Sequence, residues 1–174
     1  EKKIKNKKLK IKDESEYEIV PLTQKNVDTG FGMERNLAVV NGVNDDYKTE
    51  LFWPIIVKLQ ELSSKKYEEN LTDFRIITDH LRGAVILIND GVVPGNKLQG
   101  YVLRRLIRRA VVKMRKLGVD PMIAVFPIIE AIVNIFKGQY SVANNIKSIS
   151  EILSKELKTF SHTINKGIKI LQTH

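Results

Sequence analysis

The segment LTDFRIITDHLRGAVILINDGVVPGNKLQGYVLRRLIRRAVVKMRK, Leu71 to Lys116, decides the fold of this chain. Two long helical patterns flank a turn that is rich in glycine and proline, and a helix cannot continue through such a turn. The first pattern begins at Leu71 or Thr72 and predicts a deeply buried central helix, because its apolar residues recur at helical spacing. They are Phe74, Ile77, Leu81, Val85 and Ile88, with Ile76, Ile86 and Leu87 on other sides.

The second pattern separates apolar residues from cations. Its apolar stripe comprises Leu103, Leu106, Ile107, Ala110, Met114 and Leu117. On the opposite side lie Lys116 and a group that we call the arginine face: Arg104, Arg105, Arg108, Arg109 and Arg115. No acid occurs between Gly91 and Gly118. A solvated helix usually mixes acids with bases, so this face predicts phosphate contact. The alternative is a soluble helix whose arginines pair with acids elsewhere in the chain.

Composition limits the classes of protein that the chain can represent. Among its 174 residues, 43% are hydrophobic, the net charge is +9 and the pI is about 9.6, which favours a folded domain with a polyanionic partner. The absence of cysteine excludes a disulfide scaffold, a thiolate zinc site and a cysteine nucleophile. The three histidines are too far apart in sequence to suggest a metal site.

The ends and the apolar runs of the chain suggest its setting. The chain starts with Glu1 rather than Met and has no signal peptide, so we expect a segment of a longer, cytoplasmic protein. The longest apolar run, Met122 to Phe136, is too short to span a bilayer, and we expect no membrane partner.

The rest of the chain predicts a mainly α fold, a helical bundle-like domain of five or six helices behind a short antiparallel β segment. Residues 1–22 alternate charged and apolar side chains, which predicts two or three short strands. Their lysines favour a solvated hairpin face, with RNA contact as the alternative. Further helices are expected from Asp45 through Leu59, from Val119 to Lys137 and from Ser141 to Leu171.

A glycine motif, VDTGFGMERNLAVV, runs from Val27 to Val40. Glycines allow a backbone to approach a ligand closely, although a strand-to-helix turn explains the same residues. A helix is expected from Met33, with a glycine stop at Gly42. Phe31 and Met33 are expected to pack rather than to bind a ligand.

Two segments resemble a known family. DHLRGAVILINDGVVPGN, from Asp79 to Asn96, and GYVLRRLIRRA, from Gly100 to Ala110, resemble the central region of alanyl-tRNA synthetases. VDTGFGMERNLAVV resembles the third class II motif of that family. The resemblance implies that residues 1–43 end a class II aminoacylation domain and residues 44–174 form most of a helical tRNA-recognition domain. It also implies a ligase that activates alanine with ATP and Mg²⁺ and transfers it to tRNA.

The resemblance assigns roles to single residues. Asp28 would contact the amino group of alanine, and Gly30 would line its small side-chain pocket. Gly32 and Arg35 would bind ATP, with the guanidinium on the phosphates. Asn96 would read a G·U wobble pair near the end of the tRNA acceptor stem, since an amide both donates and accepts. The arginine face would hold the tRNA backbone.

The chain also departs from the family pattern. Gly95 replaces the usual serine and Gln99 the usual arginine, which weakens one expected phosphate contact. We find neither the first class II motif, nor the second-motif loop, nor the aspartate segment that partners the turn asparagine. We therefore expect the chain alone to bind no ATP or Mg²⁺ and to be inactive, with the tRNA acceptor stem and the rest of the synthetase as partners, and no DNA. The alternative is a stand-alone helical module, either RNA-binding or only a scaffold.

Overall fold

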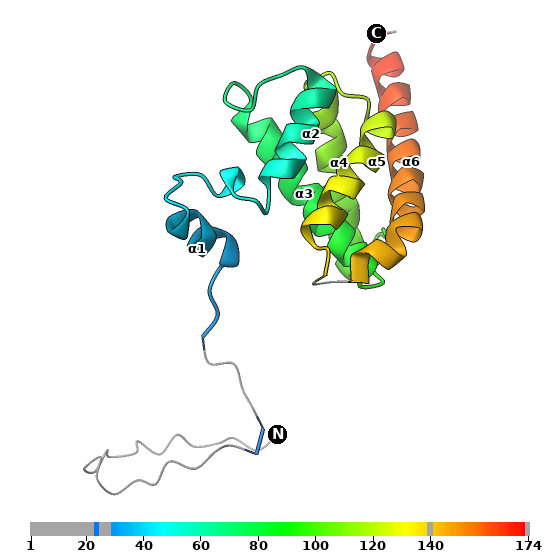
Figure 1. The fold of residues 1–174 in the computed structure, drawn as a ribbon. Helices are drawn as coiled ribbons and strands as arrows, with labels where there is room; N and C mark the ends of the chain where they lie inside the picture. The colour runs from blue at the N-terminus through cyan, green and yellow to red at the C-terminus, as the bar shows by residue number, and fades with distance from the viewer. Residues whose placement is uncertain (1–22, 25–28, 139–140, 173–174) are drawn as a thin grey trace, which may run out of the picture. The chain divides into compact units, whose positions relative to one another are not determined.

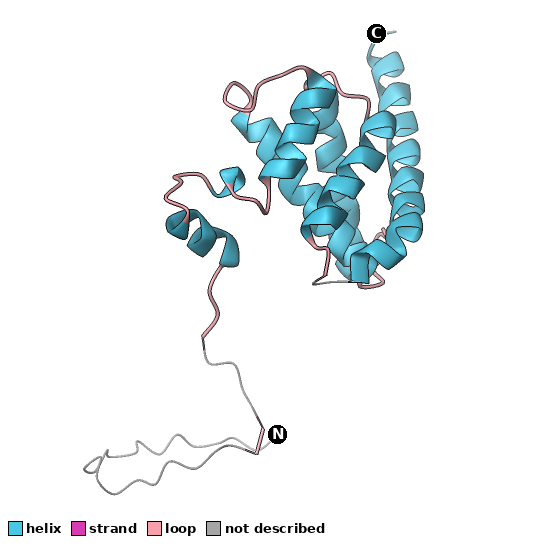
Figure 2. Cartoon of the chain, viewed as in Figure 1, coloured by secondary structure: helices cyan, strands magenta, loops and turns pink. Residues whose placement is uncertain are grey.

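The computed structural model describes residues 23–24, 29–138 and 141–172, and this part of the chain is mainly helical (Figures 1 and 2). Its elements are α1 (Met33–Val40), η2 (Asp46–Lys48), α2 (Trp53–Ser63), α3 (Leu71–Asn89), α4 (Leu98–Lys116), α5 (Pro121–Ile135), η3 (Ser141–Asn145) and α6 (Ile146–Gln172). The predicted mainly α class is confirmed. No strand occurs among the described residues, and the predicted strands of residues 1–22 lie outside them.

The chain divides into two compact units, residues 1–31 and residues 32–174, and all the helices found among the described residues belong to the second. In that unit α3 packs along α4, while α5 packs against both α2 and α6. Figure 1 shows α3 and α4 side by side, with α6 running along the same bundle. No single helix in the described ranges is long and apolar enough to cross a bilayer; α4 and α5 pass that test only as a pair, bent by 115°.

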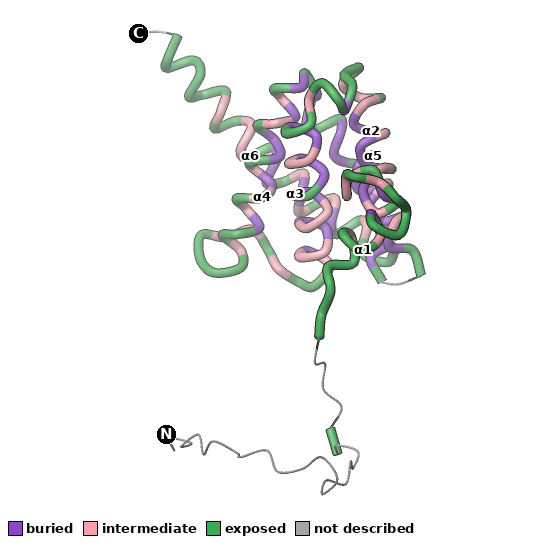
Figure 3. Tube along the Cα trace, turned by 90° about the vertical axis from the view of Figure 1, so that its left-hand side faces the viewer, coloured by how far each residue is buried: buried purple, intermediate pink, exposed green. Residues whose placement is uncertain are grey.

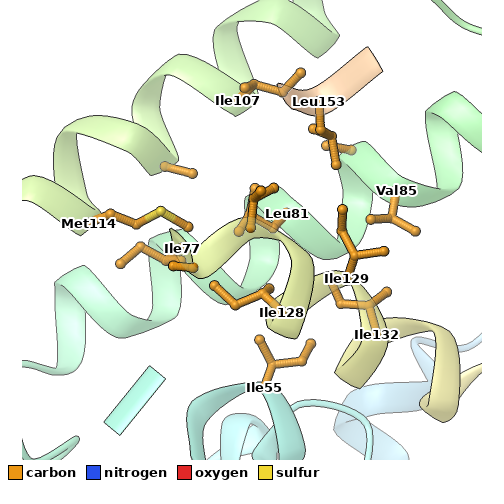
Figure 4. Packing of buried hydrophobic residues seen from close by; sticks show 14 of the residues in the cluster. Ile55, Ile77, Leu81, Val85, Ile107, Met114, Ile128, Ile129, Ile132 and Leu153 are labelled. Atoms are coloured by element: carbon orange, nitrogen blue, oxygen red, sulfur yellow. The ribbon is translucent and has the colours of Figure 1, made fainter. Parts of the chain in front are cut away.

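The core forms where the apolar stripes of these helices meet. The predicted stripes of α3 and α4 are buried, apart from the half-buried Leu106. In Figure 4 side chains of five helices converge: Ile55, Ile77, Leu81, Val85, Ile107, Met114, Ile128, Ile129, Ile132 and Leu153. The tube in Figure 3 shows buried residues recurring within each turn of α3 and α4, between intermediate residues on α3 and between intermediate and exposed residues on α4, as expected for helices with one inner face. Ile76, Ile86 and Leu87 are only partly buried, so α3 is less enclosed than predicted.

One predicted helix boundary is wrong. The helix expected from Asp45 is two elements, because the chain is extended at Thr49 and α2 begins only at Trp53. Pro54 lies in the first turn of α2, where its missing N–H costs no hydrogen bond. Asp45 instead caps η2, where its carboxylate accepts a hydrogen bond from the Tyr47 N–H at 3.1 Å.

The turn between α3 and α4 places Asn96 on the surface. Gly91 follows α3 with a φ of 88°, a conformation that strongly favours glycine. The Gly95 N–H donates to the Gly100 carbonyl at 2.9 Å and closes the turn. A Cβ at Gly100 would lie 2.6 Å from the Val93 carbonyl oxygen, so any other residue there would push the turn open. The closed turn leaves Asn96 exposed.

Candidate nucleic-acid interface

The arginine face divides into two groups according to what its side chains touch. Arg105 and Arg109 are exposed and have no ion-pair partner within the described ranges. Val112, the one apolar residue between the charges, is also exposed. Arg104, Arg108 and Arg115 are only half-exposed and point toward α6 or the α3–α4 turn. The most available positive charge therefore belongs to Arg105 and Arg109.

Glu156 of α6 is the acid that neutralises part of the face. Its carboxylate is 8% exposed and accepts a hydrogen bond from the Arg108 Nε at 2.8 Å. The Arg104 Nε lies 3.4 Å from the same oxygen. The Arg108 guanidinium also stacks 4.9 Å from the centre of the Phe160 ring. These two arginines are thus paired with an acid from elsewhere, as the alternative interpretation expects.

A hollow of about 400 Å³ lies on α4 between these side chains. It combines cations with two aromatic rings, and its lining consists of Tyr101, Arg104, Arg105, Arg108, Arg109, Val112 and Phe160. Tyr101 is exposed and Phe160 is half-buried, and cations beside such rings suit a ligand that carries both phosphates and flat bases. Further along α4, the Arg115 Nη1 donates to the Asn165 Oδ1 of α6 at 3.0 Å.

The structure brings Asn96 and the arginine face together. The Arg104 Nη1 donates a hydrogen bond to the Asn96 Oδ1, and its Nη2 donates to the Pro94 carbonyl at 3.4 Å. One arginine therefore joins the turn, α4 and Glu156. The contact engages the Oδ1 of Asn96, whose exposed side chain also carries the two N–H donors of its Nδ2.

The glycine motif is described in part. Gly32 precedes α1 as its N-cap residue, and its carbonyl accepts hydrogen bonds from the Asn36 N–H at 3.2 Å and from the Asn36 Nδ2 at 3.1 Å. Arg35 and Gly30 are exposed, and Asp28 lies outside the described residues. Gly42 ends α1 with a φ of 66°, as predicted.

Two residues of this motif do not behave as expected. Phe31 is 79% exposed and Met33 is 55% exposed, so neither side chain is buried. Val39 and Val40 of α1 are exposed as well. An apolar helix surface of this kind usually contacts another part of a protein.

Arg75 makes a different ion pair from the one that its spacing suggests. Asp79 lies four positions after it, yet the Arg75 Nη2 donates to the Asp45 Oδ2 at 2.9 Å and its Nε to the Tyr67 hydroxyl at 3.0 Å. Asp79 pairs instead with His80 at 3.1 Å. Burial raises the pKa of Tyr67 to about 12, so its hydroxyl stays protonated and donates to Asp45. The cluster holds the segment before α2 against α3.

Asp73 is a buried acid that the sequence analysis missed. Its carboxylate, 5% exposed, lies 2.8 Å from the Nζ atoms of both Lys113 and Lys116. Burial alone would raise the pKa of Asp73, but the two ammonium groups outweigh it and lower that pKa below its usual 3.8. The signal in the sequence was an acid on the apolar side of one helix and two lysines near the end of the next.

Replacing Asp73 with asparagine should lower the free energy of unfolding by about 1–3 kcal/mol at neutral pH, because two ion pairs between α3 and α4 are lost. The folded-state pKa is depressed, so the ionic contribution is complete above pH 3.8 and disappears as the pH falls through the lower folded value. Urea unfolding of both proteins at neutral pH and at about pH 3 measures this. The exposed Asp90→Asn is the control, and a gap between wild type and Asp73→Asn that does not narrow in acid contradicts the account.

Comparison with known proteins places the chain among synthetases. Residues 4–174 match the family described as tRNA synthetases class II (A). The alanine–tRNA ligase of Streptococcus mutans is 39% identical over 161 residues, which cover 90% of this chain and 18% of the relative. That of Shouchella clausii is 39% identical over 153 residues, 87% of this chain and 17% of the relative. The alanine–tRNA ligase of Fusobacterium nucleatum is 37% identical over 155 residues, which cover 87% of this chain and 18% of the relative. The chain thus spans about a fifth of the length of these curated relatives.

Proposed function

The chain belongs to the class II tRNA synthetase family, and we propose that it is the acceptor-stem-binding part of an alanine–tRNA ligase. The observation that carries the proposal is the placement of Asn96 beside the arginine face, through the hydrogen bond from Arg104. Asn96, which is suited to reading a base edge, then lies on the same surface as the arginine face, which is suited to holding the RNA backbone.

The arginine face holds the RNA backbone in this proposal. Arg105 and Arg109 contribute most, because each offers an exposed guanidinium, with no ion-pair partner among the described residues, that can contact phosphate oxygens in a fork geometry. Arg104 and Arg108 lie at the edge of the same surface and contribute less charge, since Glu156 offsets them. Arg115 keeps its full charge, but its Nη1 already donates to Asn165. Tyr101, which is exposed, offers a ring on which a base or a ribose can pack.

Asn96 reads the base pair. The wide, shallow minor groove of an RNA helix exposes base edges and 2′-hydroxyls, and an exposed turn can reach them. Arg104 donates to the Oδ1, so the Nδ2 still offers its donors while the oxygen keeps a second lone pair. A G·U pair differs from a G·C pair in the donors and acceptors that it leaves unpaired, and an amide distinguishes the two.

The residues around α1 serve the reaction of the whole ligase. Arg35 stands in the first turn of α1 with its side chain exposed, where it fits a nucleotide phosphate. Gly32 leaves room beside it: a Cβ there would meet only the Arg35 Cδ, at 4.0 Å. Asp28 and Gly30 are proposed for alanine on the resemblance alone. In this proposal residues 1–43 complete the catalytic domain, and ATP and Mg²⁺ bind with groups from the rest of the ligase.

The proposal is tested by comparing the isolated chain with the full-length protein that contains it. The full-length protein should exchange pyrophosphate into ATP in the presence of alanine and should charge tRNA with alanine. The isolated chain should do neither, because one class II motif cannot hold the phosphates from several sides. Exchange that prefers another amino acid would overturn the alanine assignment. Exchange by the isolated chain would overturn the proposal that ATP binding needs groups from the rest of the ligase.

A further inference from the structure

Glu34 and Arg82 form an ion pair that joins the two proposed functional regions. Glu34 lies in the first turn of α1, immediately before Arg35, whereas Arg82 is in the middle of α3. The Arg82 Nη1 donates to the Glu34 Oε1 at 2.9 Å, although the two residues are 48 positions apart. The Arg82 side chain is 15% exposed and that of Glu34 is 33% exposed, so water screens this pair less than it screens a fully exposed one.

Two aromatic rings hold Arg82 in place. Its guanidinium carbon lies 4.6 Å from the centre of the Phe52 ring and 5.3 Å from that of Phe136. Phe52 comes from the segment before α2 and Phe136 from the segment after α5. Together with Glu34 of α1, they hold the Arg82 guanidinium from three parts of the bundle. A backbone hydrogen bond and Arg82 lower the pKa of Glu34 despite partial burial and the nearby Asp79 carboxylate, and Glu34 therefore stays charged at neutral pH.

The rest of α1 buries little of its surface against the bundle. Ala38 is its one buried residue, and Val39 and Val40 point to solvent. An ion pair at the first turn therefore has a large share in setting the direction of the helix. Arg35 is the next residue along, so a change in that direction moves its guanidinium relative to any bound nucleotide.

We propose that Arg82 is a positioning residue, which holds α1 through Glu34 so that Arg35 meets the phosphates of ATP. The inference rests on the proposed function. It adds a mechanical connection, because α3, which carries Arg82, packs along α4, which carries the arginine face. RNA bound to α4 and nucleotide bound at α1 are then connected through α3, which contacts both helices.

The test is the KM for ATP in alanine-dependent pyrophosphate exchange by the full-length protein. Arg82→Gln and Glu34→Gln should each raise this KM by roughly threefold to tenfold, with a smaller change in the KM for alanine. The effect is below that of losing a buried charge-assisted hydrogen bond, because Glu34 is partly exposed and acts on Arg35 indirectly. The double variant should be no worse than either single variant, because both remove the same contact. Arg82→Lys keeps the charge and should recover part of the loss.

A matched control removes another ion pair of α3. Lys113→Gln breaks the contact to Asp73 at 2.8 Å, far along the chain from α1, and should leave the KM for ATP unchanged. Glu34→Gln and Arg82→Gln lose the same ion pair and each should lower the melting temperature somewhat, so circular dichroism at the assay temperature checks that both variants are folded. The inference is overturned if Glu34→Gln has the wild-type KM for ATP, or if the two single effects multiply in the double variant. If the wild-type protein shows no exchange with alanine, the proposed function fails instead.

Discussion

Asn96→Ala should reduce the preference for a G·U over a G·C pair in the acceptor stem by about 1–3 kcal/mol, which is the scale of one directly read base edge. Because Asn96 is uncharged, the dependence of binding on salt should stay as in the wild type. The measurement is competition between two stem RNAs that differ only in this pair, with the full-length protein.

The matched control for Asn96 is Gln99→Ala, which removes another exposed amide near the same turn. It should leave the preference intact. Arg104→Ala should lower both affinity and preference, since Arg104 holds the Asn96 Oδ1 and also carries a charge. If Asn96→Ala retains the full preference for G·U, the turn is structural and another residue reads the pair.

Removing Arg105 and Arg109 together should have the largest effect on RNA affinity. Each free guanidinium that neutralises a phosphate contributes about 0.9 to the slope of log K against log salt, so Arg105→Gln with Arg109→Gln should shallow the slope by about two. At 100 mM salt, loss of two such contacts corresponds to roughly a hundredfold weaker binding.

Arg104 and Arg108 provide the comparison for that prediction. Arg108→Gln should shallow the slope by clearly less than Arg109→Gln, because Glu156 already offsets its charge. Glu156→Gln should act in the opposite direction and steepen the slope, as it releases both arginines. Filter binding over a range of salt concentrations measures all of these variants. Equal slopes for Arg108→Gln and Arg109→Gln contradict the division of the arginine face.

The long helices were predictable because their signals are local. The stripe from Phe74 to Ile88 buries as expected, and Gly91 and Gly118 end α3 and α4 with positive φ. The start of α2 was harder. Acids at Asp45 and Asp46 suit a helix start, but Pro54 fits only a first turn, and this second constraint decides the boundary.

The partners of charged residues were not predictable from spacing. Arg75 and Asp79 satisfy the rule for ion pairs four positions apart. Arg75 pairs instead with Asp45, 30 positions away, because these two residues form a partly buried cluster with Tyr67. Glu156 reaches Arg108 over 48 positions, which depends on how α6 packs on α4. A helical wheel places Arg108 as far from the apolar stripe as Arg105, so the division of the arginine face follows from the packing of α6 and not from spacing along α4.

The most direct test of the central claim is filter binding of the chain to an acceptor-stem RNA across a salt series. An RNA-binding face on α4 predicts that log K falls linearly with log salt, with a slope of about −2 to −4 for the available arginines. A helical scaffold, in which the arginines serve only solubility and internal pairing, predicts no binding at any salt concentration. Binding whose strength does not change with salt would contradict the account equally, because the arginines would then not be holding phosphates.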